Sequence, residues 1–199
     1  GVALGRLERW SDAESALLAA RDALGAADPR ERARLGAMAG NAALARGAAD
    51  AALTALDPAH ADALSAGDKA LAGQIAIDRA RALVALGRSD DAGAALAEAR
   101  GAVPGSAEAW LLSATLSRRT GKLAEAQAQI EKAAALLPVD PEIGLEAGVI
   151  AMLSGHEDAA RKSWQSVVAA APGSAAAATA RGYLAQIAAP ATAAGTPVR

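Results

Sequence analysis

Several residue types that commonly carry chemistry are absent from this sequence or scarce in it. There is no cysteine, which excludes disulfides, thiolate nucleophiles and cysteine-ligated metals. Aromatic residues make up only 2% of the 199 residues. No apolar stretch approaches the roughly 20 uninterrupted residues that a membrane-spanning helix requires. The net charge of −2 and the pI near 5.7 provide no basic surface for nucleic acid. We therefore expect no membrane span and no nucleic-acid partner.

Alanine and leucine supply most of the apolar content of 53%, and both residues favour helix. Residues that suit strands are few, so the composition predicts an all-α fold. Arginine outnumbers lysine, and with the abundant alanine and glycine this composition is typical of a GC-rich bacterial gene. We expect a soluble bacterial protein, with cytoplasm and periplasm both open. Because the chain starts at Gly1 without a methionine, a removed leader or a longer parent protein also stays open.

Three kinds of residue recur with a period of 34 in the second half of the chain. Prolines, glycines and alanines each occur three times at this spacing: Pro104, Pro138, Pro172; Gly87, Gly121, Gly155; Ala92, Ala126, Ala160. Proline ends a helix, and glycine is suited to the left-handed backbone that often follows one. Since three independent markers share one period, the sequence predicts tandem helical repeats.

This pattern resembles the tetratricopeptide repeat, a helix–turn–helix unit of 34 residues. In the repeat positions of that family, three regular repeats cover residues 73–106, 107–140 and 141–174. Small residues then occupy positions 8 and 20, and bulky residues occupy position 24: Ala80, Ala114, Gly148; Ala92, Ala126, Ala160; Leu96, Ile130, Trp164. Ser106 and Asp140 stand where they can cap the following helices. The resemblance implies an α-solenoid of about four to five stacked hairpins.

Outside the regular repeats the resemblance is looser. It implies an irregular repeat over 31–66, with about six residues inserted around Asp57-Pro58 and 65–67, and a partial repeat over 1–27 in which Trp10 begins a second helix. On this register Gly1 lies inside a first helix, as expected for a piece of something longer. A closing helix is expected over 175–189, which completes a single solenoid domain over 1–189, and a disordered tail over 190–199.

No catalytic, cofactor or metal site emerges from the sequence. The only histidines, His60 and His156, have no partner at metal-ligand spacing. The acidic residues after Gly155 are expected to lie at a helix N-terminus, where they complement the helix dipole. The three tryptophans are expected in the core. We therefore expect a non-enzymatic protein.

In tetratricopeptide domains the first helix of each repeat lines a concave groove. Carried over residue by residue, the resemblance implies a groove with an apolar strip and charged edges. The strip is Ile77, Leu111, Leu145, Val149 and Met152, and its edges are Arg81, Arg118, Glu108 and Glu142. Position 5 holds Ile77, Leu111 and Leu145, so the lysine of the family's carboxylate clamp is missing. We expect a scaffold that binds a peptide or helix of a partner protein. The closing helix or a partner subunit could instead cover this strip. The alternative function is structural self-association as a homo-oligomer, in which the strip or the unfinished N-terminal repeat end pairs with a second copy of the chain.

Overall fold

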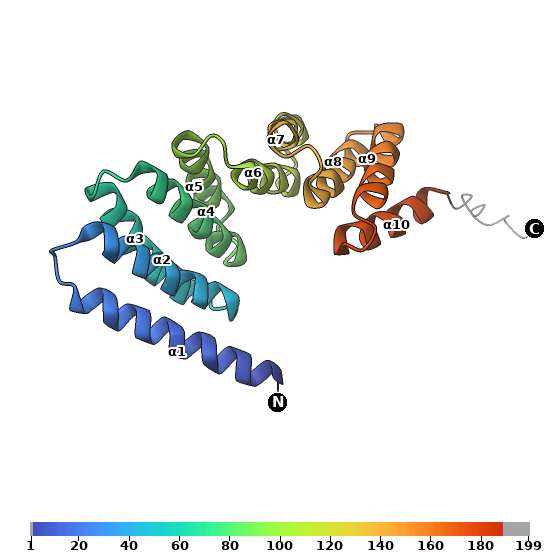
Figure 1. Cartoon of the computed structure of the whole chain (residues 1–199). Helices are drawn as coiled ribbons and strands as arrows, with labels where there is room; N and C mark the ends of the chain where they lie inside the picture. The colour runs from blue at the N-terminus through green and yellow to red at the C-terminus, as the bar shows by residue number, and fades with distance from the viewer. Residues whose placement is uncertain (1, 189–199) are drawn as a thin grey trace, which may run out of the picture. The chain divides into compact units, whose positions relative to one another are not determined.

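The computed structural model describes residues 2–188, with side chains from Arg9 onward, and these residues form ten α-helices and no strand (Figure 1). In chain order the helices are α1 (Val2–Ala23), α2 (Pro29–Ala45), α3 (Ala49–Ser65), α4 (Lys69–Ala85), α5 (Ser89–Ala102), α6 (Ala107–Arg119), α7 (Leu123–Leu136), α8 (Pro141–Leu153), α9 (Glu157–Ala170) and α10 (Ala175–Ala188). The all-α prediction is confirmed. The tail expected over 190–199 lies outside the described residues.

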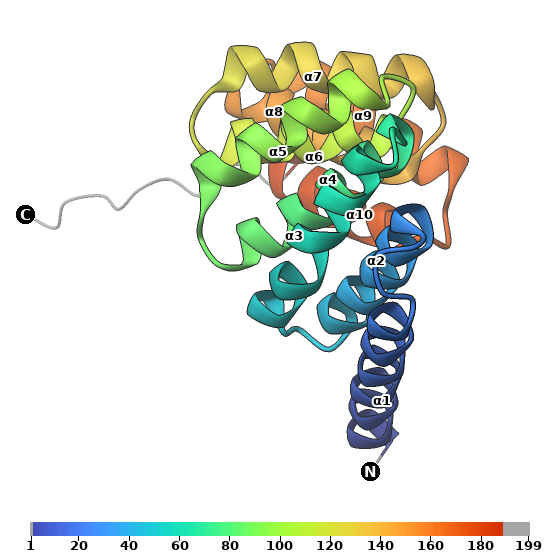
Figure 2. The same ribbon diagram turned by 90° about the vertical axis from the view of Figure 1, so that its left-hand side faces the viewer.

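The chain divides into two compact units, the first ending at Leu116 and the second beginning at Ser117. In the first unit α2 packs against α3 and α4 against α5, while α3 contacts α4 and α1 lies on α2. In the second unit α8 packs against α9, with α7 on α8 and α10 on both. In both views α1 is the outermost helix of the first unit (Figure 2). That the two units form the single domain expected over 1–189 stays a prediction.

The repeat register assigns every helix one of two roles. Helices α2, α4, α6, α8 and α10 are first helices, and α1, α3, α5, α7 and α9 are second helices. Within the regular repeats the turn from first to second helix contains a glycine with a φ of +75°, +78° or +79°, at Gly87, Gly121 and Gly155. A residue with a Cβ is strained in that conformation, which explains why these turns hold glycine. The predicted turn glycines are therefore confirmed.

The predicted helix starts are also confirmed. The carboxylate of Asp140 accepts hydrogen bonds from the backbone N–H groups of Glu142 and Ile143 at 2.9 and 3.0 Å. The hydroxyl of Ser106 accepts one from the N–H of Ala109 at 3.3 Å. These N-terminal N–H groups have no partner inside their own helix, so a side-chain cap stabilises the start.

First and second helices meet through small residues at fixed repeat positions. A Cβ added to Gly148, at position 8, would lie within 3 Å of the Trp164 indole, at position 24 of the same hairpin. Gly40 and Leu56 repeat this contact between α2 and α3. Position 4 faces position 27 in the same two hairpins: Gly36 against Ala59, and Gly144 against Val167. Small residues therefore let the paired helices approach closely, as the register predicted.

The residues at positions 20, 24 and 27 are buried in the second helices α3, α5, α7 and α9. Positions 20, 24 and 27 are no more than 4% exposed at each occurrence: Ala52, Leu56, Ala59; Ala92, Leu96, Ala99; Ala126, Ile130, Ala133; Ala160, Trp164, Val167. The same three positions thus form the core of every complete repeat, including the irregular one.

The six residues inserted before the regular repeats, expected around Asp57-Pro58 and 65–67, lengthen both α3 and α4. Helices α3 and α4 have 17 residues each, against 14 in α5 and 13 in α6. Together α3 and α4 are seven residues longer than α5 and α6, and the connection at 66–68 is one residue shorter than that at 103–106. The longer helices therefore account for all six inserted residues. Pro58 lies inside α3, where its missing N–H removes one backbone hydrogen bond without ending the helix.

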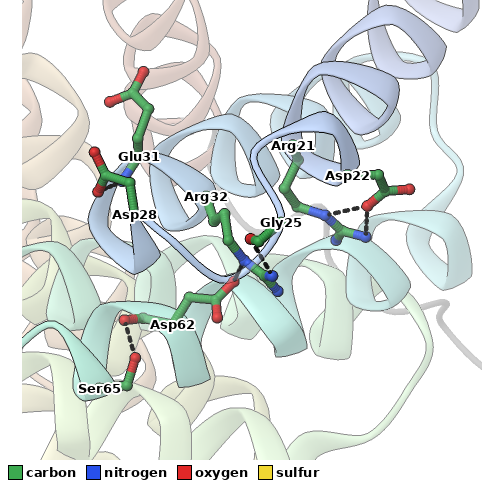
Figure 3. A network of polar contacts seen from close by, with 8 residues as sticks. All are labelled: Arg21, Asp22, Gly25, Asp28, Glu31, Arg32, Asp62 and Ser65. Carbon is green, nitrogen blue, oxygen red and sulfur yellow. Dashed lines mark hydrogen bonds and ion pairs between the residues drawn. The ribbon is translucent and has the colours of Figure 1, made fainter.

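Helix α1 also differs from the prediction. It is continuous from Val2 to Ala23, so the expectation that a second helix begins at Trp10 is wrong. The helix is fixed to its neighbours by polar contacts. Glu14, which is buried, binds Arg46 at 2.8 Å. Beyond its C-terminus, Arg32 donates to the carbonyl of Gly25 at 2.7 Å and to Asp62 of α3 at 3.0 Å (Figure 3).

Candidate protein-binding surface

The candidate binding surface is the first-helix face, which we define as repeat positions 2, 5, 9, 12 and 13 of the first helices. In the first unit it is carried by α2, α4 and the start of α6, because α2 contacts α4 directly. In the second unit it is carried by α8, with the last residues of α6 beside it. The face is described separately in each unit.

In the second unit the predicted strip is half-buried. Leu145, Val149 and Met152 pack against an apolar cluster that also contains Trp164 and Tyr183. Tyr183 belongs to α10, so the closing helix covers part of the strip. Leu153, at position 13, is 55% exposed. The strip therefore keeps an accessible apolar edge at the C-terminal end of α8.

The three tryptophans have different environments. Trp164 is 3% exposed and donates its indole N–H to the carbonyl of Leu145 at 3.2 Å. Its ring is tilted by 38° against that of Tyr183, with 4.9 Å between the ring centroids. Trp110 is only half-buried, and Arg100 lies 5.2 Å above its ring. Trp10 is 44% exposed on α1. The prediction of a core position is therefore confirmed for Trp164, overstated for Trp110 and wrong for Trp10.

In the first unit Ile77 does not lie on the open face, so its prediction as a groove residue is wrong. It is fully buried in a cluster with Ala99 of α5 and Ala109 of α6. The N-terminal part of α6 closes over this position because its own position 3 is the small residue Ala109. Leu111 stays partly exposed, as a contact residue requires.

The two arginines predicted at the edge of the groove are both engaged with carboxylates of the chain itself. Arg81 of α4 binds Asp78 at 2.7 Å and also Glu108 of α6. Arg118 binds Glu146 of α8 through two nitrogens, at 2.6 and 3.3 Å. Each arginine thus connects one first helix to the next, and its charge is largely neutralised. Sequence reasoning missed Glu146, because position 6 is not among the family's groove positions.

Asp78 lies at position 6 of α4, next to the first-helix face, and its side chain is nearly buried. Burial raises the pKa of the Asp78 carboxyl above its ordinary value. The side-chain hydrogen bond from Asn41 and the guanidinium of Arg81 lower this pKa without cancelling the effect of burial. The three side chains connect α2 to α4. The spacing of three between Asp78 and Arg81 could have indicated their contact on one helix.

Replacing Asp78 with asparagine is expected to preserve or raise stability at neutral pH. A carboxyl whose pKa is higher in the folded than in the unfolded state contributes most to stability at low pH, and that contribution is lost as the pH rises through the folded pKa. The free energy of unfolding of Asp78→Asn, measured with urea between pH 4 and 8, should therefore increase relative to the unsubstituted chain as the pH rises. A variant that is clearly less stable at pH 7 would show that the ionised form is favoured by its partners.

Neither histidine belongs to a metal-binding cluster among the described residues. His156 lies at the N-terminus of α9, with Glu157 and Asp158 in the first helical turn as predicted. His60 contacts Glu98 at 2.6 Å between α3 and α5. Within the described residues no group of three or more histidines or carboxylates is arranged to hold a metal ion. No described helix combines the length and the apolarity needed to cross a membrane.

Comparisons with known proteins agree on the fold. No protein-family model matches the sequence, and no curated protein matches it. The structure is similar to that of YrrB, described as a TPR protein with an unusual peptide-binding site, at a TM-score of 0.66 and 22% identity over 88% of this chain and 87% of that one. It is also similar to MamA 41-end from Desulfovibrio magneticus RS-1, at a TM-score of 0.62 and 14% identity over 85% and 97% of the two chains.

A third similar structure is TTC0263, described as a thermophilic TPR protein in Thermus thermophilus, at a TM-score of 0.51 and 20% identity over 77% and 97% of the chains. At these identities the similarity concerns the fold. It agrees with the 34-residue period, with the ten helices of the described chain and with the contact between positions 8 and 24. The chain therefore has the tetratricopeptide-repeat fold, an α-solenoid of helix–turn–helix hairpins.

Proposed function

We propose that this chain is a non-enzymatic interaction module that binds an apolar segment of a partner protein, either a helix or an extended peptide, on its first-helix face. The observation that carries the proposal is the apolar edge on α8. Leu153 is mostly exposed, and the half-buried Leu145, Val149 and Met152 extend from it at helical spacing. An accessible apolar stripe of this kind is typical of peptide-binding sites.

The charges on the face support an apolar partner over an acidic one. Arg81 and Arg118 are already bound to carboxylates of the chain, and position 5 offers no lysine. A carboxylate ligand would have to displace Glu108 or Glu146, which leaves little net attraction. Met152 suits the proposed contact because its unbranched side chain adapts to different partners. Leu111 is the corresponding contact residue in the first unit.

Similarity to tetratricopeptide proteins supports a scaffold role in general terms. YrrB is described as having a peptide-binding site, which agrees with the class of ligand proposed here. The choice of α8 as the contact helix depends on the exposed residues of this chain alone.

The proposal is tested with a displayed peptide library selected on the immobilised chain. We expect the enriched peptides to carry apolar residues three or four apart, and to bind equally well when their C-terminal carboxylate is amidated. Leu153→Asp should weaken binding of the best peptide at least about tenfold, which corresponds to about 1.4 kcal/mol. Since Leu153 is exposed, the helix content measured by circular dichroism should be unchanged.

The matched control is Leu137→Asp. Leu137 is a second exposed leucine of the same unit, 51% exposed against 55% for Leu153, but it lies at the C-terminal end of α7 and outside the first-helix face. Equal losses in both variants would show that the substitution acts through general surface apolarity. Selected peptides that require a free C-terminal carboxylate would contradict the apolar mode of binding.

A further inference from the structure

A cavity of about 240 Å³ lies among α3, α4 and α5, on the side of α4 that faces away from the first-helix face. Its position follows from the helix period, because Arg79 lines the cavity and stands about 200° around α4 from Arg81. The floor is apolar and consists of Leu53, Leu83 and Ala95, which are no more than 8% exposed. The cavity lies within the first unit, and none of its lining residues belongs to α1 or α10.

Two charged side chains of the lining keep hydrogen-bonding groups that the protein does not use. Arg79 of α4 donates its Nε to Asp57 of α3 at 2.8 Å, and both terminal NH2 groups of its guanidinium are without a protein partner among the described residues. Glu98 of α5 contacts His60 through Oε1 at 2.6 Å, and its Oε2 has no partner within those same residues. The cavity therefore combines a guanidinium fork and a carboxylate oxygen with an apolar floor.

The other charged pair of the lining is closed on itself. Arg88 binds Asp91, three residues further along the chain, through Nε and Nη2, both at 2.7 Å. The groups left to a ligand are thus one positive and one negative. A ligand with only a negative charge would be repelled by Glu98, and a ligand with only a positive charge would leave the NH2 groups of Arg79 without an acceptor. A ligand with one charge of each sign satisfies both groups.

The repeat itself does not require these two charges. Arg79 and Glu98 occupy positions 7 and 26 of their repeat, and the same positions of the last regular repeat hold Ala147 and Ser166. Helix α8 packs on both α7 and α9 with these uncharged residues. The arginine and the glutamate are therefore features of this cavity rather than of helix packing in the repeat.

We propose that the cavity binds a free α-amino acid with an apolar side chain. The α-carboxylate accepts hydrogen bonds from the terminal NH2 groups of Arg79, because a guanidinium binds a carboxylate through paired donors and this pair is free. The α-ammonium group donates to Glu98. The apolar side chain covers Leu53 and Leu83 on the floor, which removes apolar surface from water.

The size of the cavity sets the size of the ligand and its affinity. Pockets for drug-sized ligands measure roughly 300–1,000 Å³, so this cavity suits a smaller molecule. Since a small ligand makes few contacts, we expect a dissociation constant in the upper micromolar to millimolar range. The site is separate from the strip on α8, which lies in the other unit, and the failure of either proposal leaves the other untouched.

The test is a titration of the nitrogen-15-labelled chain with L-leucine, followed by the chemical shifts of the backbone amides. We expect saturable shifts concentrated in residues 53–57, 79–83 and 94–98. N-acetyl-L-leucine, which lacks the ammonium group, and L-leucinamide, which lacks the carboxylate, should each bind at least about tenfold more weakly. Equal binding of the three compounds, or no saturable shift up to about 20 mM L-leucine, would overturn the proposal.

Two variants assign the charged contacts. Arg79→Gln should weaken binding of L-leucine at least about tenfold and leave that of L-leucinamide unchanged, because this compound has no carboxylate. Glu98→Gln should weaken binding of L-leucine similarly and leave that of N-acetyl-L-leucine unchanged. A merely structural role of the two side chains would weaken all three compounds together. Full binding of L-leucine by Arg79→Gln would contradict the assigned contact.

Arg30→Gln is the matched control. Arg30 binds Asp68 at 2.7 Å and joins α2 to the N-cap of α4, much as Arg79 and Asp57 join α4 to α3, but neither Arg30 nor Asp68 lines the cavity. This variant should bind L-leucine like the unsubstituted chain. A loss equal to that of Arg79→Gln would show that the ion pairs between helices matter and the cavity does not.

The dipeptide L-leucylglycine distinguishes a free amino acid from the end of a peptide chain. It carries the same ammonium group and side chain, but a peptide bond and one more residue separate them from the carboxylate. We expect it to bind more weakly than L-leucine, because the two charges no longer match the spacing of one amino acid. Tighter binding of the dipeptide would overturn the assignment to a free amino acid.

Discussion

Trp164→Ala is expected to lower the free energy of unfolding by about 3–5 kcal/mol, as large-to-small substitutions of buried aromatic residues do. The indole is 3% exposed and fills the space above Gly148 between α8 and α9. Its removal would also leave the carbonyl of Leu145 without this donor and would end the stacking contact with Tyr183. Urea unfolding followed by circular dichroism at 222 nm measures the loss without depending on tryptophan fluorescence.

The other two tryptophans provide internal controls for this result. Trp110→Ala should cost clearly less, because its ring is only half-buried and is covered on one side by the guanidinium of Arg100. Trp10→Ala should change stability by no more than about 0.5 kcal/mol, as surface substitutions generally do. Comparable losses for Trp164 and Trp110 would show that Trp110 is a core residue after all.

The repeat register could be predicted from the sequence because it depends on contacts within one hairpin. Gly148 and Trp164 are 16 residues apart, and the short connection between α8 and α9 leaves the paired helices few ways to pack. The environment of Trp110 was less predictable. Its environment includes the carbonyl of Pro104 and the guanidinium of Arg100 from the preceding repeat, and the period of 34 residues does not specify such side-chain contacts between repeats.

The irregular repeat shows a second limit of reasoning from spacing. A period of 40 instead of 34 reveals that six residues have been added, but not whether they extend helices or loops. Asp57-Pro58 is a residue pair that is typical of turns. In the structure α3 continues through Pro58, because burial of Leu56 and Ala59 on α2 outweighs the loss of one backbone hydrogen bond.

The sequence could assign the charged residues to the first helices, but it could not predict their ion-pair partners. Family positions selected Arg81 and Arg118 correctly as residues of the first helices, yet both bind carboxylates on the next first helix along the chain. Their partners are 27 and 28 residues away, and such pairs depend on how neighbouring repeats stack. The burial of Ile77 has the same origin. Contacts between repeats therefore pair the two arginines that were predicted at the edge of the groove with carboxylates of the chain.

Gly148→Ala is expected to destabilise the chain by about 1–3 kcal/mol, the range typical of an overpacked core. The added Cβ would fall within 3 Å of three atoms of the Trp164 indole, and a planar ring held by a hydrogen bond and by Tyr183 cannot move aside as a flexible side chain can. Helix propensity favours alanine by only about 1 kcal/mol, so the steric term decides the sign.

Gly182→Ala makes the same substitution at the same repeat position and should have the opposite effect. Nothing lies within 4 Å of the added Cβ on α10, so only the gain in helix propensity remains, and stability should rise by about 0.5–1 kcal/mol. Both variants are compared by urea unfolding at the same protein concentration. Opposite signs would follow because, among the described residues, α9 packs over Gly148 and nothing lies within 4 Å of a Cβ at Gly182. A stabilised Gly148→Ala would mean that α8 and α9 do not pack through positions 8 and 24.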